Sequence, residues 1–196
     1  AASGALTPNL PFDPIKDFSP IAMIGSSPFV LLASSQGPSK TLEEFVAQAK
    51  ANPGKLSYAS AGTGTLTHLA GELVKWKTGI DVLHVPYRGS EQSLADVLMG
   101  RLDLLVGTIP PTYTHVREGK LRAFAIMSES RHPLLPDVPT IGEAGAPGCE
   151  AALWTALVAP AGVPAGIIAR LGQTMSAIVN SPDVQQSLKL QGITPE

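Results

Sequence analysis

Apolar and polar positions follow two periods along the first fifty residues, and the pattern predicts strands followed by a helix. Residues 21–24 and 29–33 are apolar runs separated at Pro28, which predicts strands bent or broken at the proline. Thr41 and Glu44 fit a capping box at the start of the next segment. Apolar residues in that segment recur at 42, 45, 46 and 49, which is the spacing of one buried helix face.

The middle of the chain repeats a strand-then-helix pattern. Short apolar runs that read as strands lie at residues 56–59, 81–85, 102–106 and 121–127. The segments between them carry apolar residues at helical spacing. Strands that alternate with helices form parallel β-α-β units, so we expect an α/β lobe here.

Beyond this region the pattern changes to turns, one further strand and two helices. Residues 131–150 are rich in turn-forming residues, and residues 153–160 read as a strand. A helix with an apolar stripe opens at Pro164, and a second helix has Ser181 as its N-cap. The stripe needs a partner surface, because apolar area left in water costs roughly 25 cal/mol per Å².

Composition and charge narrow the possible function classes. Of the 196 residues, 44% are hydrophobic and 15% are charged, and the formal net charge is −2. This balance favours a folded core and offers no basic surface for nucleic acid. No apolar run approaches the roughly 20 residues that cross a bilayer, so we expect a chain that is not embedded in a membrane. The single cysteine, Cys149, excludes an internal disulfide and a multi-thiolate metal site.

A glycine-punctuated turn follows the strand at 56–59 and opens the next helix. In α/β sheets ligands bind beyond the carboxyl ends of the strands, where helix N-termini present free N–H groups. Small residues at such a place let an anion approach the backbone. We interpret six of them as a ligand-binding loop, the glycine loop: Ser60, Ala61, Gly62, Thr63, Gly64 and Thr65. The alternative is a turn that only joins a strand to a helix.

The glycine loop fits no nucleotide motif. A Walker loop needs a lysine after its last glycine, where Thr65 stands, and a dinucleotide fingerprint needs a third glycine, where Thr67 stands. We therefore expect no cofactor. No G-x-S-x-G elbow surrounds a serine, and no metal-ligand cluster or carboxylate pair can be named, so we expect neither catalytic residues nor a bound metal.

A second loop, the arginine loop, follows the strand at 81–85 and again leads into a helix. Its Arg88 is a planar donor suited to a carboxylate, although a solvated surface charge is the alternative. The other members assigned to the site are Tyr87, Gly89 and Ser90. His68 and Trp154 are assigned to it as well, and ordinary packing is the alternative for each of them.

Five segments stand in a particular order along the chain. They read KDFSPIAMI, ANPGKLSYASAGTGTLTHLAGEL, HVPYRGSEQSLADVLMGRLDLLVGT, EGKLRAFAIMSESRHPLLPDVPTIGEAG and WTALVAPAGVPAGIIARL. In this order and spacing the chain resembles the Bug-type periplasmic substrate-binding receptors of tripartite tricarboxylate transporters. Each segment alone is weakly specific, and the resemblance rests on all five together.

The resemblance implies a two-lobed α/β fold of the periplasmic-binding-protein type. Such a protein closes around a small organic acid and presents it to the membrane permease subunits of its transporter. The lobe that residues 27–128 form would be complete, whereas residues 1–26 and 129–196 would form part of the other. Thr108 joins the expected contacts, because relatives place an acidic or amide residue in its region. Relatives also extend further at both ends, which implies a truncated chain with weakened or absent binding, or binding restored by association between chains.

Three function classes follow from the residues and the resemblance. The favoured one is a receptor without chemistry of its own, in which hinge closure traps a carboxylate in a cleft between the lobes. The second is a small α/β hydrolase or transferase that uses the glycine loop for a phosphate. The third is a ligand-sensing module that signals to a partner protein. The sequence leaves the identity of the acid open.

Overall fold

The chain forms two compact units, which the computed structural model describes over residues 10–195. Unit 1 contains the described residues 10–27 and 153–195, and unit 2 contains residues 28–152. Residues 1–9 and 196, which we assigned to the first lobe, lie outside the described residues. Residues 129–152 were expected in the same lobe but belong to unit 2, because residues such as Ile141 and Cys149 are buried in its core.

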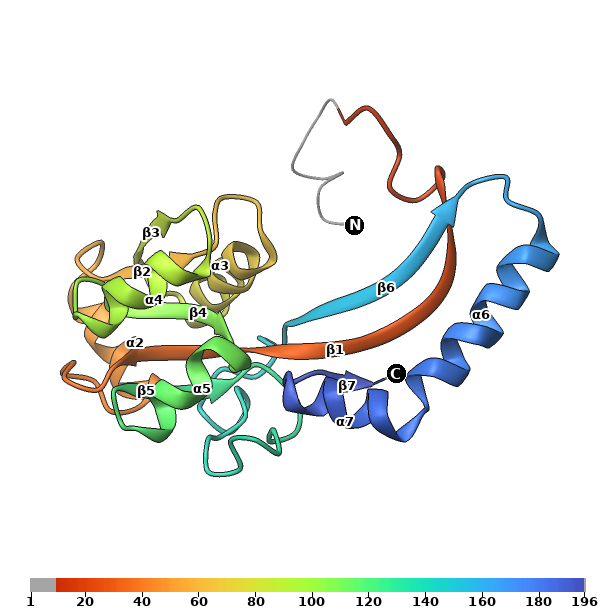
Figure 1. Ribbon diagram of the computed structural model, residues 1–196. Coiled ribbons are helices and arrows are strands. Elements are labelled where there is room, and N and C mark those ends of the chain that lie inside the picture. The colour runs from red at the N-terminus through yellow and green to blue at the C-terminus, as the bar shows by residue number, and fades with distance from the viewer. Residues whose placement is uncertain (1–9, 196) are drawn as a thin grey trace. The chain divides into compact units, whose positions relative to one another are not determined.

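Unit 2 is built on a mixed sheet (Figure 1). Its strand order is β3 (Leu83–Pro86), β2 (Ser57–Ser60), β4 (Leu104–Thr108), β1 (Phe18–Ser34) and β5 (Leu121–Ile126). β2 runs parallel to both β3 and β4, as the alternating pattern predicts. β1 is antiparallel to β4 and β5, an arrangement that the pattern did not predict.

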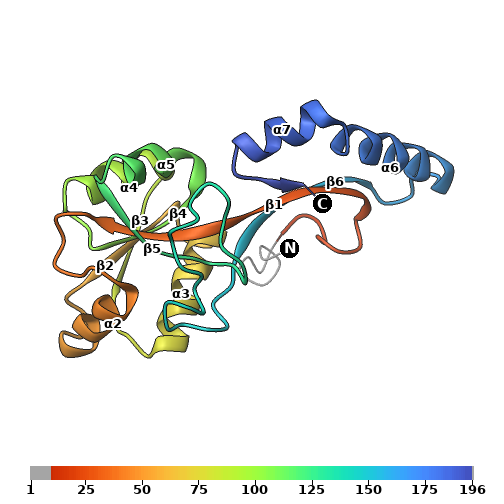
Figure 2. The same cartoon turned by 90° about the horizontal axis from the view of Figure 1, so that it is seen from below.

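Two layers of helices cover this sheet. Figure 2 shows α2 (Leu42–Ala51) and α3 (Leu66–Thr78) on one face, and α4 (Ser90–Leu98) and α5 (Ile109–Arg117) on the other. Each face buries its own apolar cluster, in which side chains of the helices pack on alternate residues of the strands. Removal of this apolar surface from water is the main force that holds unit 2 together.

The start of α2 confirms the predicted cap. The Thr41 side chain accepts a hydrogen bond from the Glu44 amide at 3.1 Å. The Glu44 carboxylate turns back to the Lys40 amide at 2.6 Å, one residue before the position that a capping box specifies. The helix therefore begins where its local sequence predicts.

Of the two alternatives expected at Pro28, a bend or a break, the break is absent, because β1 is one strand over Phe18–Ser34. Gly25 and Ser26 pair with β7 (Thr194–Pro195), whereas the residues from Phe29 onward pair with β4. Pro28 lies between the two pairings. Its missing N–H therefore interrupts neither ladder, and the strand continues through it.

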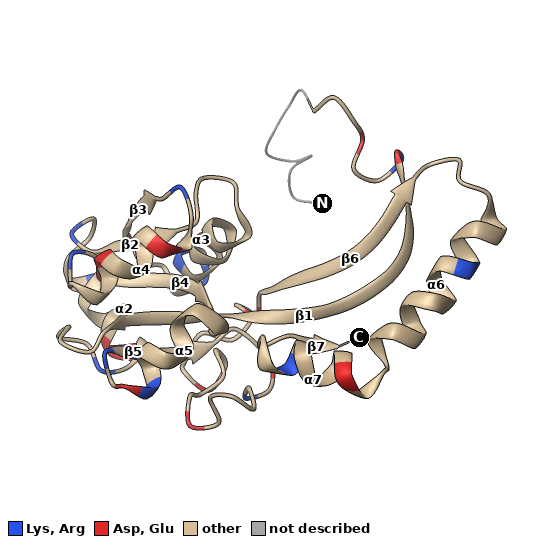
Figure 3. Cartoon of the chain, in the orientation of Figure 1, with Lys and Arg blue, Asp and Glu red and all other residues tan. Residues whose placement is uncertain are grey.

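Unit 1 contains β6 (Ala152–Pro160), which pairs with β1, and the helices α6 (Ala165–Val179) and α7 (Pro182–Leu190). Along α6, Ile167, Leu171 and Ile178 are exposed, and Arg170 is its one charged residue (Figure 3). The predicted apolar stripe thus exists, and much of it is uncovered. Among the helices of the described residues, none combines the length and the apolarity that crossing a membrane requires.

Candidate functional site

Three parallel strands of unit 2 end side by side at the expected site. Ser60 at the end of β2 pairs with Pro86 at the end of β3, and β4 runs parallel on the other side of β2 and ends at Thr108. The helices α3, α4 and α5 begin just after these strand ends. The glycine loop (residues 60–65) and the arginine loop (residues 87–90) are therefore neighbours.

The two loops contact each other directly. The Tyr87 amide donates a hydrogen bond to the Ser60 carbonyl at 3.1 Å. A Cβ atom at Gly62 would lie 3.2 Å from the Tyr87 carbonyl oxygen, and Gly62 has a φ of +131°. Both facts require glycine at position 62.

The glycine loop satisfies most of its own donors, which corrects the expectation that its amides are free for an anion. Four of its N–H groups donate within the loop and the first turn of α3. The bonds are Ala61 to Thr67 Oγ1 at 3.0 Å, Gly62 to Ser60 Oγ at 3.1 Å, Gly64 to His68 Nδ1 at 3.2 Å and Thr65 to the Gly62 carbonyl at 3.2 Å. Thr63 is an exposed residue, and within the described residues its amide donates no hydrogen bond.

The N-terminus of α3 is closed by the same loop. Thr65 is its N-cap, and the Thr65 hydroxyl accepts from the His68 amide at 3.3 Å. That hydroxyl also lies 2.7 Å from the Gly62 carbonyl, to which it donates. Short hydroxyl side chains thus take up donors that a bare helix N-terminus would offer to a ligand.

The arginine loop is open by comparison. Gly89, the N-cap of α4, has a φ of +127°, and no side chain caps the helix. The first N–H groups of α4 have no acceptor inside their own helix. Arg88 is exposed, and over residues 10–195 it forms neither a hydrogen bond nor an ion pair. Ser90 is exposed beside it.

Tyr87 has a structural partner for its hydroxyl group. Its Oη donates to the Asp96 carboxylate of α4 at 2.6 Å, and Arg101 contacts the same carboxylate at 3.0 Å. The Tyr87 hydrogen bond and the Arg101 charge hold the pKa of Asp96 below its ordinary value, and the same hydrogen bond raises the pKa of Tyr87. The ring of Tyr87 can still form a wall of the site, but its hydroxyl is engaged.

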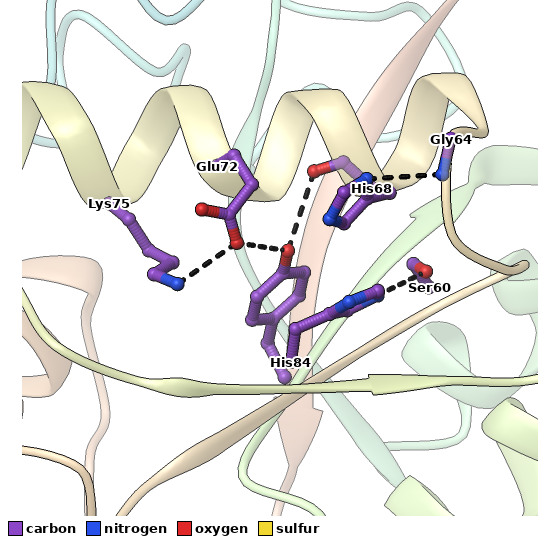
Figure 4. Close-up of polar contacts among 7 residues, drawn as sticks. Ser60, Gly64, His68, Glu72, Lys75 and His84 are labelled. Atoms are coloured by element: carbon purple, nitrogen blue, oxygen red, sulfur yellow. Dashed lines mark hydrogen bonds and ion pairs between the residues drawn. The ribbon is translucent and has the colours of Figure 1, made fainter. Parts of the chain in front are cut away.

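A polar network that the sequence analysis missed lies beneath the glycine loop (Figure 4). Its first part joins β2 to α3: Tyr58 Oη donates to Glu72 Oε1 at 2.7 Å, and Lys75 Nζ lies 2.9 Å from the same oxygen. Burial and the Glu72 contact raise the pKa of Tyr58. Gly71 allows this arrangement, because any Cβ there would overlap the Tyr58 ring.

The second part of the network consists of two histidines. His84 Nε2 lies 2.7 Å from Ser60 Oγ, and the ring of His84 is stacked on Tyr58 with centroids 4.8 Å apart. His68, which we assigned as a ligand contact, accepts a hydrogen bond from the loop itself. The sequence offered only a histidine on a predicted strand; the pairing of His84 with Tyr58, on the same face as Ser60, comes from the register of the two strands.

Two other predicted residues stand apart from the loops in their roles. Thr108 is the N-cap of α5, but its hydroxyl makes no capping bond, and Pro110 and Pro111 in the first turn have no N–H to offer. Trp154 lies on β6 in unit 1, where 48% of the residue is exposed, and so belongs to a different unit from the loops. Among residues 10–195, no group of three or more His, Cys, Asp or Glu is placed to hold a metal ion.

The chain resembles proteins of known family and structure. A family described as "Tripartite tricarboxylate transporter family receptor" matches residues 2–196. MatC from Rhodopseudomonas palustris, solved with bound malate, is 35% identical, with a TM-score of 0.85 over 99% of this chain and 66% of that one. A second R. palustris protein, solved with adipate, is 33% identical, with a TM-score of 0.85 over 95% and 62% of the two chains. The periplasmic binding protein BugD is 30% identical, with a TM-score of 0.83 over 99% and 66%.

The chain is shorter than these proteins. It spans 55% to 59% of the length of the first five curated relatives that it matches. Matched over nearly its whole length, it follows the α/β fold of periplasmic binding proteins.

Proposed function

This chain belongs to the tripartite tricarboxylate transporter family of receptors, and from that premise we propose that its arginine loop, supported by the glycine loop, binds the carboxylate of a small organic acid. The family is described as receptors and BugD as a periplasmic binding protein, which supports a receptor in preference to a hydrolase or transferase. The acid itself, the transporter and the cellular compartment are parts of the proposal.

The proposal rests on the difference in free N–H donors between the two loops: over residues 10–195 the arginine loop has unpaired donors, whereas the glycine loop uses most of its own. Arg88 has no partner in the described residues, and it stands directly before a helix N-terminus that no side chain caps. A guanidinium presents a planar pair of N–H groups to a carboxylate, and the helix end adds backbone N–H groups and the positive end of its dipole. Thr63 contributes a further free amide from the neighbouring loop.

The chemistry of the relatives' ligands supports a dicarboxylate. MatC was solved with malate and a second R. palustris protein with adipate, and both molecules carry two carboxylates. In this chain one carboxylate would sit at Arg88 and the start of α4. The surface of the arginine loop is exposed, so the affinity of this site alone is expected to be weak, with a dissociation constant on the order of 1 mM, or about −4 kcal/mol.

A titration of the ¹⁵N-labelled chain with malate and with adipate tests this site. We expect saturable shifts at the amides of residues 88–92 and of Thr63. Arg88→Ala should reduce the affinity about tenfold or more, because it removes a charge-assisted pair of hydrogen bonds. Arg117→Ala is the matched control, since Arg117 lies at the far end of α5, where its partner is Tyr113. Equal affinity of Arg88→Ala and the unaltered chain would place the carboxylate elsewhere.

The second step of the proposal is delivery of the acid to membrane permease subunits from the periplasm. Family membership and the likeness to a periplasmic binding protein support it. Uptake of labelled malate by cells that lack the gene should be restored by the unaltered gene and not by its Arg88→Ala form. No uptake with the unaltered gene would contradict delivery, and restored uptake by both forms would contradict the role of Arg88. A transcriptional response to malate without any uptake would favour the ligand-sensing alternative.

A further inference from the structure

The imidazole side chains of His84 and His68 both form hydrogen bonds to the glycine loop. His84 on β3 contacts Ser60 Oγ at 2.7 Å, and His68 on α3 accepts from the Gly64 amide at 3.2 Å (Figure 4). The two rings face each other, with centroids 4.2 Å apart and an angle of 30° between their planes. His84 therefore contacts the first residue of the loop, and His68 contacts its second glycine.

Ser60 connects His84 to the rest of the glycine loop, because its hydroxyl group bonds to both His84 and Gly62. Its side chain is fully buried, and its Oγ accepts from the Gly62 amide at 3.1 Å. The same oxygen lies 3.2 Å from the Gly62 carbonyl. A hydroxyl has one proton and two lone pairs, so an Nε2–H on His84 would complete its bonds: two accepted and one donated.

His68 fixes the protonation state that the loop requires. A backbone N–H can only donate, so Nδ1 of His68 must carry a lone pair while the Gly64 bond exists. Protonation of Nδ1 removes the acceptor. It also places a positive charge against the ring of His84, only 4.2 Å away, and a second proton on His84 would add direct repulsion.

The titratable groups around this pair come from β2 and α3. Tyr58 stacks on His84 from β2, while Glu72 and Lys75 approach from α3. Burial lowers the pKa of His84, and the neighbouring charges of His68 and Lys75 lower it further against the opposing effect of Glu72. Partial burial works to raise the pKa of Glu72, but its bonds from Tyr58 and Lys75 outweigh this effect, so the pKa is lowered and the carboxylate stays ionised.

We propose that His84 and His68 are positioning residues for the carboxylate site: neutral His68 accepts from Gly64 and lies against the ring of His84 in the closed form of the glycine loop, and loss of that acceptor on protonation, together with repulsion between two charged rings, releases the loop and weakens binding. The inference rests on the proposed function for its second half only. The closed loop supports the arginine loop through the Tyr87 amide and the Gly62 contact, so an opened loop would disturb the site next to it.

The first test needs no ligand. Amide hydrogen exchange of Gly62 and Gly64 is measured between pH 8 and pH 5.5 and expressed as protection relative to an unstructured peptide at each pH. We expect protection of both amides to fall about fivefold or more on acidification. His68→Gln keeps a neutral acceptor and should hold the Gly64 protection constant, His68→Leu should lose it at every pH, and His115→Gln on α5 should behave like the unaltered chain. Protection that is independent of pH in the unaltered chain would overturn the proposal.

The second test couples the histidines to the ligand. Malate affinity of the unaltered chain is divided by that of the His68→Gln/His84→Gln chain at each pH, which cancels the titration of malate itself. We expect this ratio to fall about fivefold between pH 7.5 and pH 5.5. A ratio that rises would mean that protonated histidine attracts the carboxylate, and a constant ratio would exclude any coupling. If malate binds neither chain, the proposed ligand site fails while the exchange experiment still decides the role of the histidines.

Discussion

The glycine loop and the arginine loop occupy equivalent places in unit 2, yet they present opposite surfaces. Each follows a parallel strand and opens a helix. The glycine loop caps its own helix with Thr65 and donates four of its amides internally, whereas α4 starts at Gly89 without a side-chain cap. Small residues next to a helix N-terminus are thus no measure of free donors. The side chains that follow them decide whether the loop is a support or a binding surface.

The largest effect should come from side chains added at the two glycines with positive φ, and it should be unequal. Gly62→Ala and Gly89→Ala each force a conformation that L-residues avoid, at about 1–3 kcal/mol. Gly62→Ala should cost more, because its Cβ would lie 3.2 Å from the Tyr87 carbonyl, whereas nothing lies within 4 Å of a Cβ at Gly89. Urea unfolding of both variants measures the difference. Equal losses in the free energy of unfolding would show that the contact between Gly62 and Tyr87 does not contribute to stability.

An intermediate effect is expected at the helix caps. Thr65→Ala removes the hydroxyl that accepts from His68 N and should lower the free energy of unfolding by about 1 kcal/mol. Thr108→Ala is its matched control, since Thr108 is also an N-cap threonine but makes no capping bond, and a change below about 0.5 kcal/mol is expected. Thermal unfolding of the two variants compares them. A loss of stability in Thr108→Ala as large as in Thr65→Ala would contradict the conclusion that the N-terminus of α3 is capped by a side chain and that of α5 is not.

The smallest effect concerns the support of the arginine loop. Tyr87→Phe deletes the hydrogen bond to Asp96, so the pKa of Asp96 should rise toward its ordinary value. Because folding lowers this pKa, the contact stabilises the protein above an ordinary pKa of about 3.9 and is lost as the pH falls below it. Carboxyl ¹³C titration by NMR checks the direction. The malate affinity at pH 7.5 should stay near that of the unaltered chain, as the hydroxyl already faces α4.

Local patterns predicted the elements whose determinants lie within a few residues. α2 followed from Thr41, Glu44 and the spacing of its apolar face, and it begins at Leu42 as that spacing requires. Pairing between distant segments was beyond such patterns. The continuity of β1 through Pro28 depends on a change of partners, and β7 exists only because Thr194 and Pro195 pair with β1.

The site was predictable to the same extent. The adjacency of the two loops follows from parallel strands, whose carboxyl ends lie at one edge of a sheet. The closure of the glycine loop was not predictable, since it depends on the side-chain directions of Ser60, Thr67 and His68. The role of His84 depends on the register of β3 against β2, which places it beside Tyr58 and within reach of Ser60.

Cys149 is a natural probe for the opening of unit 2. It is the chain's one cysteine, and its thiol lies fully buried in the core of unit 2, 3.9 Å from the Leu73 carbonyl of α3. Burial also raises the pKa of this thiol, which keeps it unreactive while the core is intact. The rate at which a thiol reagent labels the unaltered protein therefore measures how often unit 2 opens around α3. A ligand that binds at the loops should slow that labelling without any engineered probe.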